Sequence, residues 1–183
     1  MYADNTLTPR EAFRLAALGE LAIEAKRYGA LAASVRRFVG SIVGPSIDLL
    51  GPSIELLKYE GLVEPDGGQG MADGAILRIT EAGRREFTTL LTANLRDGAT
   101  ELNKLVTALK FRFLDLLDPE ARRDQAALLC EATANELARL EDLRRDPSAH
   151  QGYLGDWLES DIALLEMRLG WLQRFARALD AGR

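Results

Sequence analysis

The first 60 residues repeat their hydrophobic side chains at intervals of three and four, which is the period of an α-helix. In the first helix, Thr8 suits the capping position, Pro9 the first helical position and Glu11 the third. Glycine-containing breaks separate this helix from two more. The pattern therefore predicts three helices, over residues 9–27, 30–39 and about 46–60.

After the third helix the hydrophobic period changes from that of a helix to that of a strand. Residues 62–64 and 75–79 are predicted strands, and the glycine-rich residues 65–74 between them are the loop of a β-hairpin. Thr80 then caps a further helix. Three helices, a hairpin and a helix are the order of a winged helix-turn-helix domain. Such a domain presents its third helix to the DNA major groove, and its hairpin, here the wing at about 62–79, to the flanking backbone or minor groove.

The rest of the chain is predicted to be helical, over residues 99–117, 119–145 and about 156–179. The last helix carries a leucine stripe with alternating spacings of four and three, typical of a coiled-coil seam. The leucine stripe consists of Leu158, Ile162, Leu165, Leu169, Leu172, Ala176 and Leu179. Beside it an aromatic stripe, which repeats every seven residues, consists of Trp157, Leu164, Trp171 and Ala178.

An apolar helix face as wide as these two stripes would be an exposed patch in a monomer, which monomeric proteins avoid. One stripe can pack on the chain's own helices and the other on a partner. We predict a dimer interface along the leucine stripe; the alternative is a bundle of three helices within one chain. The fold class is therefore mainly α, with a winged helix-turn-helix domain over residues 1–96 and an all-helical C-terminal dimerisation domain over residues 97–183.

Composition narrows the class of protein. The net charge of −5 means that DNA binding would depend on local clusters of cations, because phosphate contacts need Lys and Arg. A single cysteine, Cys130, excludes internal disulfides and multi-cysteine metal sites. No run of about 20 apolar residues could span a membrane. The first residues lack the basic and apolar regions of an export signal, so a cytoplasmic location is expected.

The stretch from Gly51 to Phe87 resembles the recognition helix, wing and exit helix of PadR-type transcriptional regulators. The matching features are Pro52, Leu57, the run Gly61-Leu62-Val63 and the run Ile79-Thr80-Glu81-Ala82-Gly83-Arg84. The helix that begins at Asn103 and the tryptophan-bearing last helix also resemble that family's C-terminal half. The resemblance implies a homodimer that exchanges its C-terminal helices and binds an operator. In some such proteins, aromatic compounds are sensed by the C-terminal region.

Seven residues are candidates for contacts with double-stranded DNA: Arg36, Arg37, Ser46, Ser53, Lys58, Arg84 and Arg85. Arg36 and Arg37 end the second helix, where arginine can clamp a phosphate or simply suit the helix dipole. The outward residues of the third helix are predicted to be Asp48, Ser53, Glu55, Lys58 and Tyr59, so that helix either reads bases or presents a mildly acidic face to solvent. No lysine or arginine lies between Leu62 and Leu77 in the wing.

Tyr153, Trp157 and Trp171 are candidates for an effector pocket that accepts a small aromatic compound, although aromatic residues at helical spacing also form cores. His150 lies in a polar loop and is predicted to be solvated. Cys130 lies on an apolar helix stripe, where a buried thiol is expected. The sequence contains no nucleophile elbow, P-loop or Rossmann fingerprint, so no enzyme activity, cofactor or metal is expected.

The sequence thus predicts a DNA-binding transcriptional regulator of PadR type, a repressor that acts as a homodimer and is released by a small-molecule effector. The alternative is a winged-helix module that binds another protein, with weak or no DNA binding. The acidic third helix and the wing loop, which carries no lysine or arginine, favour that alternative, because neither would attract phosphate.

Overall fold

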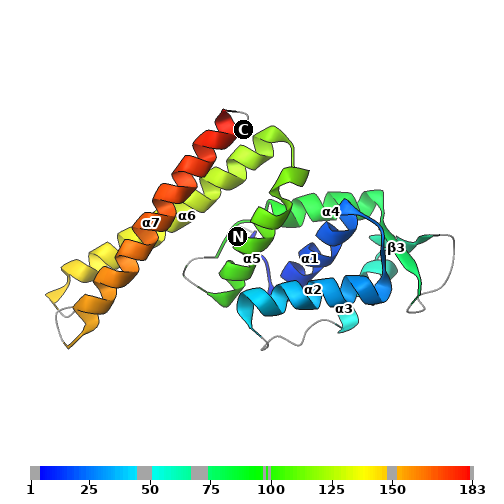
Figure 1. Ribbon diagram of the computed structural model, residues 1–183, viewed down its shortest axis with the longest axis horizontal. Coiled ribbons are helices and arrows are strands. Elements are labelled where there is room, and N and C mark those ends of the chain that lie inside the picture. Colours follow the sequence, from blue (N-terminus) through cyan, green and yellow to red (C-terminus); the bar gives the residue numbers. More distant parts are fainter. Residues whose placement is uncertain are drawn as a thin grey trace. The chain divides into compact units, whose positions relative to one another are not determined.

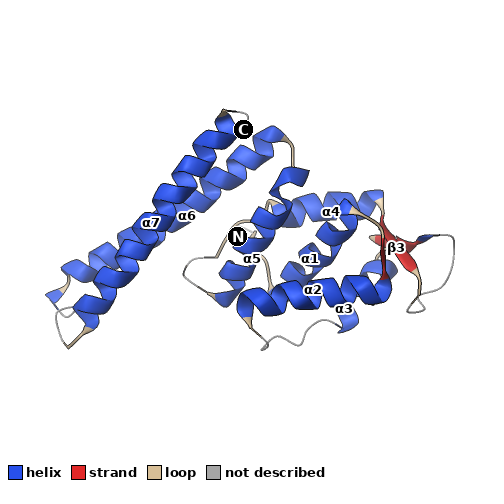
Figure 2. Cartoon of the chain, viewed as in Figure 1, coloured by secondary structure: helices blue, strands red, loops and turns tan. Residues whose placement is uncertain are grey.

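The computed structural model describes residues 5–44, 51–66, 74–96, 98, 100–147 and 152–181 (Figure 1). The chain divides into two compact units. Unit 1 contains Met1–Arg96 and Thr100–Leu117, and unit 2 contains Asp97–Ala99 and Asp118–Arg183. Helices make up most of both units, and one small sheet lies in unit 1 (Figure 2). In the described ranges, no helix has the length and apolar character that a membrane crossing requires.

Unit 1 is built around its first helix. Its helices are α1 (Pro9–Ile23), α2 (Tyr28–Val43), α3 (Gly51–Tyr59), α4 (Glu81–Leu91) and α5 (Glu101–Phe113), followed by a short 3-10 turn, η2 (Leu114–Leu116). The helix α1 contacts all four other helices and the strand β3. The run Leu15–Leu21 of α1 is buried throughout, which explains its high content of alanine and leucine. Thr8 and Glu11 form the predicted capping box.

A three-stranded antiparallel sheet lies beside the helices of unit 1. Its strands are β1 (Lys26–Arg27), β2 (Val63–Pro65) and β3 (Ile76–Ile79), in the order β1-β3-β2. The predicted alternation of β3 is confirmed, because Leu77 and Ile79 are buried while Ile76 and Arg78 are exposed. The winged helix-turn-helix class predicted from the element order is confirmed by these helices and this hairpin.

Several helix boundaries differ from the sequence prediction, among them the end of α5, which is Phe113 rather than residue 117. Two of the differences have a local cause. The first helix ends at Ile23 rather than at residue 27, because Lys26 and Arg27 pair with β3. The second helix continues through Gly40 and ends at Val43; its C-cap is Gly44, whose φ of 80° lies in the left-handed region that favours glycine. Residues 45–50, the predicted start of the third helix, lie outside the described part of the chain.

Unit 2 is an antiparallel pair of long helices, α6 (Pro119–Arg145) and α7 (Leu154–Asp180) (Figure 1). Asp118 caps α6 through a hydrogen bond from the N–H of Ala121 to its Oδ1, and Pro119 takes the first helical position. Leu158, Ile162, Leu165 and Leu172 of the leucine stripe are buried, since α7 packs along α6.

The boundary between the two compact units lies at Leu117, whereas the sequence suggested residue 96. The reason is that α5 packs with the winged-helix elements, against α1 and α2. Leu105, Leu109 and Phe113 of α5 are buried there. Their helical spacing resembles that of α6, so the periodicity alone does not tell which unit α5 joins.

Candidate nucleic-acid interface

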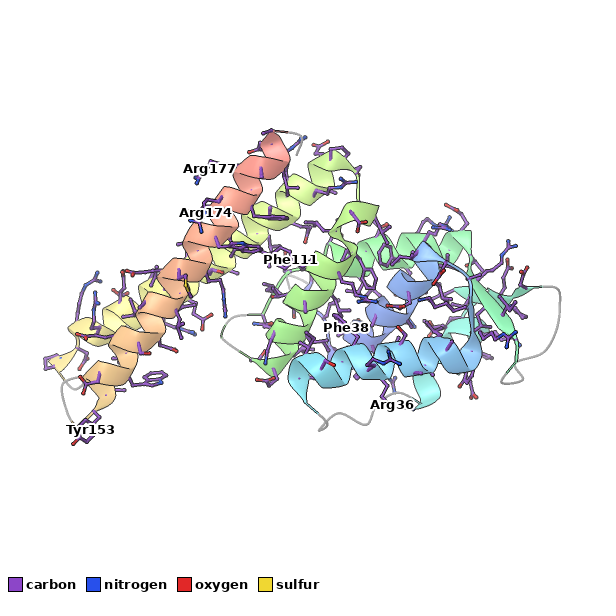
Figure 3. The ribbon with its side chains drawn as sticks, in the orientation of Figure 1. Arg36, Phe38, Phe111, Tyr153, Arg174 and Arg177 are labelled. Atoms are coloured by element: carbon purple, nitrogen blue, oxygen red, sulfur yellow. The ribbon has the colours of Figure 1, made fainter. Side chains whose placement is uncertain are left out.

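The exposed side of α2 carries the two arginines predicted to clamp phosphates. Val35 and Val39 face the core, and Arg36 and Arg37 are exposed (Figure 3). Within the described ranges, neither guanidinium forms an ion pair with a carboxylate. An unpaired, exposed guanidinium can accept a phosphate without first breaking an internal contact.

The position of α2 is fixed by a buried carboxylate. Glu20 of α1 is 2% exposed and accepts hydrogen bonds from Lys26 Nζ at 2.6 Å, from Ser34 Oγ at 3.0 Å and from Arg112 Nε at 3.0 Å. Burial alone would raise the pKa of Glu20, but the hydrogen bonds from Lys26, Arg112 and Ser34 hold it below its ordinary value. The ionised Glu20 therefore joins β1, α2 and α5 to α1.

An aromatic contact reinforces this arrangement next to the arginine pair. The guanidinium carbon of Arg112 lies 4.7 Å from the ring centroid of Phe38, which directly follows Arg37 on α2 (Figure 3). A cation over an aromatic face is attracted by the ring quadrupole. Arg112 thus binds Glu20 and Phe38 at once, and it holds α2 against α5.

Three of the side chains predicted to face outward on the third helix, those of Glu55, Lys58 and Tyr59, are described by the structure. Ile54 and Leu57 are buried, Glu55 and Tyr59 are exposed, and Lys58 is half-buried. Ser46 and Asp48 lie outside the described residues, and the side chain of Ser53 is also outside the described part of the structure. The described part of α3 therefore offers one carboxylate, one ammonium and one phenol to a ligand.

Contacts at its C-terminal end fix α3 within unit 1. Arg14 of α1 forms ion pairs with Glu60, next to α3, and with Glu86 of α4. Thr80 Oγ1 donates to the carbonyl of Gly61 at 2.8 Å, and the N–H of Thr80 donates to the carbonyl of Leu62 at 3.0 Å. These bonds tie the start of the hairpin to the start of α4.

The arginines near the wing differ in whether a carboxylate of the chain already pairs with them. Arg78 of β3 is paired with Glu64 at 3.7 Å and with Asp66 at 3.3 Å. Arg85 lies 3.9 Å from Glu81, whereas Arg84 forms no ion pair in the part of the chain that the structure describes. Residues 67–73 of the wing loop lie outside that part.

Two exposed residues near this face were not among the predicted contacts. Arg27 lies at the N-terminus of α2 and is exposed, and Tyr59 is 90% exposed at the end of α3. Arg27 was missed because a two-residue strand shows no periodicity. Tyr59 was predicted to face outward on the third helix, but it was not proposed as a contact.

The residues predicted for an effector pocket lie on one exposed helix face. Tyr153 precedes α7 (Figure 3). Trp157 and Trp171 of α7 are 54% and 47% exposed. The ring of Trp171 stacks on that of Phe175, with 5.5 Å between centroids. His150 lies outside the described residues, and burial raises the pKa of the half-buried Cys130 on α6. Among the residues described, no cluster of three metal-ligating side chains was found.

Residues 2–176 match a family model described as "Putative AphA-like transcriptional regulator". The chain belongs to this AphA-like family of transcriptional regulators. The crystal structure of Bacillus subtilis PadR in complex with operator DNA matches with 17% identity and a TM-score of 0.37, over 91% of this chain and 98% of that chain. No curated protein sequence matches the chain.

Proposed function

We propose that this AphA-like regulator binds double-stranded DNA through unit 1 and represses transcription as a homodimer. The observation that carries the proposal is the exposed pair Arg36 and Arg37, which has no carboxylate partner in the described residues and lies on the helix before α3. Arg84 would add a further phosphate contact beside the wing. Ser46, Ser53, Lys58 and Arg85 are the remaining predicted contacts. No catalytic role is proposed for any residue.

The dimer is proposed to form through the outer face of α7 rather than through the leucine stripe, whose central residues are already buried against α6. This outer face is the aromatic stripe together with the residues that extend it at spacings of three and four. Its members are Leu154, Trp157, Asp161, Leu164, Arg168, Trp171, Phe175 and Ala178. The large apolar side chains exposed there would be covered by a second copy. The aromatic residues predicted for an effector pocket are here assigned to the dimer contact. Release of the regulator from DNA by a small aromatic compound is therefore a separate prediction.

The charges of the outer face favour an antiparallel pair of α7 helices. Trp157 and Trp171 lie seven residues before and after Leu164, and Asp161 and Arg168 lie three before and four after it. When two copies cross antiparallel at Leu164, each Asp161 approaches Arg168 of the partner subunit. A parallel pair would instead bring like charges together. Neither Asp161 nor Arg168 has an ion-pair partner within the chain's described ranges.

The test of DNA binding is a salt titration on DNA from the promoter region next to the protein's own gene. A protein that neutralises several phosphates loses affinity steeply with salt. Replacement of Arg36 and Arg37 by alanine should weaken binding to all sequences alike. It should also make the slope of log K against log salt shallower, by about 0.9 for each phosphate that is no longer neutralised. Arg144→Ala/Arg174→Ala, which removes two arginines of unit 2 that are also exposed and without an ion pair in the described residues, is the charge-matched control.

An interaction module remains the second candidate because Glu55 places a carboxylate on the exposed side of α3. If the wild-type dimer gives no retardation even at low salt, the DNA-binding proposal is wrong. If Arg36→Ala/Arg37→Ala and the control Arg144→Ala/Arg174→Ala both leave retardation unchanged, the α2 arginines do not contact DNA. The rest of the proposal would then stand.

A further inference from the structure

Glu55 is exposed on α3, the helix that a winged-helix domain presents to the major groove. Ile54 and Leu57 are 2% and 1% exposed and define the inner side of α3. Glu55 and Tyr59 are one helical turn apart on the outer side. Glu55 forms no hydrogen bond or ion pair with the residues that the structure describes, and Lys58, three residues on, is not paired with it. Its oxygens are therefore available to a ligand.

The chemistry of a carboxylate limits what Glu55 can recognise. An ionised carboxylate only accepts hydrogen bonds, so phosphate and the acceptor-rich edge of guanine repel it. In the major groove, the donors are the amino groups of cytosine and adenine. Adenine places its N7 acceptor beside its amino group, and that acceptor would face the second carboxylate oxygen. Cytosine carries no acceptor at the major-groove edge of its own ring, which makes it the better partner.

We propose that Glu55 is a specificity-determining residue, which selects a cytosine at one position of each operator half-site and weakens binding to other sequences. The proposal rests on the proposed function, since it requires that α3 enters the major groove. This proposal also accounts for the exposed acidic residue on α3. A carboxylate that lacks a cytosine amino group in front of it stays unpaired near the phosphates, so the protein dissociates sooner from incorrect sites.

The experiment is a parallel selection from a randomised duplex DNA library with the wild type, Glu55→Gln and Glu159→Gln. Glu159 of α7 is also exposed, and its replacement makes the same change in net charge in unit 2. The wild type and Glu159→Gln should enrich the same motif, with one conserved C·G pair in each half-site. Glu55→Gln should lose that preference or exchange it for A·T, because glutamine pairs with the N6 and N7 of adenine.

Binding to single-base variants of the selected duplex gives the magnitude. Replacing the cytosine should reduce wild-type affinity roughly 5- to 100-fold and should not reduce the affinity of Glu55→Gln by more than about twofold. Identical motifs for the wild type and Glu55→Gln would overturn this inference while leaving DNA binding intact. Failure of the wild type to enrich any motif would instead overturn the proposed function, so the two failures are distinguishable.

Discussion

Gly83 lies where the first turn of α4 crosses the start of the hairpin. A Cβ atom there would overlap the carbonyl oxygen of Leu62 and come within 2.8 Å of Ile79 Cγ1. Three residues earlier, Thr80 Oγ1 accepts a hydrogen bond from the N–H of Gly83 at 3.0 Å and donates to Gly61. The threonine and glycine of the run Thr80–Arg84 therefore serve packing and capping, and only its arginine is available to a phosphate.

Replacement of Gly83 by alanine should lower the free energy of unfolding by about 1–3 kcal/mol, because backbone atoms must move to admit the methyl group. Denaturant unfolding followed by circular dichroism measures this change. Gly40→Ala is the control, since no atom lies within 4 Å of its added Cβ and the exposed position is inside α2. That variant should be as stable as the wild type or more stable, by up to about 1 kcal/mol. Equal stability of Gly83→Ala and the wild type would contradict the packing argument.

Lys110 of α5 is fully buried, and its Nζ donates hydrogen bonds to the carbonyls of Leu91 and Ala93 at 2.6 and 2.7 Å. These carbonyls lie at the C-terminal end of α4, where a cation also suits the helix dipole. Burial lowers the pKa of Lys110 from 10.5 to about 8. Between these two values the unfolded chain holds a proton that the folded chain has lost, so folding releases it.

The free energy of unfolding should therefore rise with pH between about 8 and 10.5, by about 3 kcal/mol from this group. Denaturant titrations at half-unit steps of pH measure the slope. Lys110→Met removes the titrating group, so its stability should lack this rise. If both proteins respond to pH in the same way across this window, Lys110 keeps an ordinary pKa in the folded state.

At the scale of elements, α7 has an inner and an outer side that differ in burial. Leu165 is 7% exposed and faces α6, whereas its neighbour Leu164 is 53% exposed. The sequence shows two stripes with equally regular spacing and does not say which one is covered by the chain itself. Contact with α6 buries four residues of the leucine stripe within the chain, Leu158, Ile162, Leu165 and Leu172.

Leu164→Asp should give a folded monomer, because an aspartate on the outer face is harmless in one copy but unpaired and desolvated between two. Leu165→Asp should instead destabilise unit 2, because it places a carboxylate between α6 and α7. Sedimentation velocity and thermal unfolding separate these outcomes. A dimer of unchanged affinity in Leu164→Asp would exclude the outer face of α7 as the interface.

The orientation of the two helices can be tested by exchanging charges. Asp161→Arg and Arg168→Asp should each weaken an antiparallel dimer, and the double variant should restore it, because the attractive pair is re-formed with its charges exchanged. Continued weakness in the double variant would argue for another arrangement of the helices.

At the scale of the whole molecule, dimerisation and DNA binding are expected to be linked. Two winged helices held in one dimer bind two half-sites with a high effective concentration of the second domain. Net charge does not supply this affinity, since the chain carries five more acidic than basic residues.

The monomeric variant Leu164→Asp should therefore bind the full operator at least about 100-fold more weakly than the wild type, and with an affinity close to that for a single half-site. Fluorescence anisotropy with full and half operators measures both values. Wild-type affinity for the full operator in a variant shown to be monomeric would mean that one winged helix is sufficient.

The sequence by itself determined the helices, the hairpin and their order. These features depend on residues that are close together in the sequence, so the sequence predicts them directly. They are the helical periodicity, the capping signals at Thr8 and Thr80, and the alternation in residues 76–79. For the same reason the outward position of Glu55, Lys58 and Tyr59 on α3 was predictable. The family resemblance added the expectation of a transcriptional regulator, which the AphA-like family model supports.

Only the tertiary structure decided which surfaces are covered and which cations are paired. The strand β1 exists because β3 offers it a partner, and α5 joins unit 1 because α1 and α2 cover its apolar side. Arg78 is paired with Glu64 and Asp66, and Glu20 joins groups from β1, α2 and α5. These outcomes depend on residues that are distant in sequence and adjacent in space, and periodicity along one chain carries no information about such contacts.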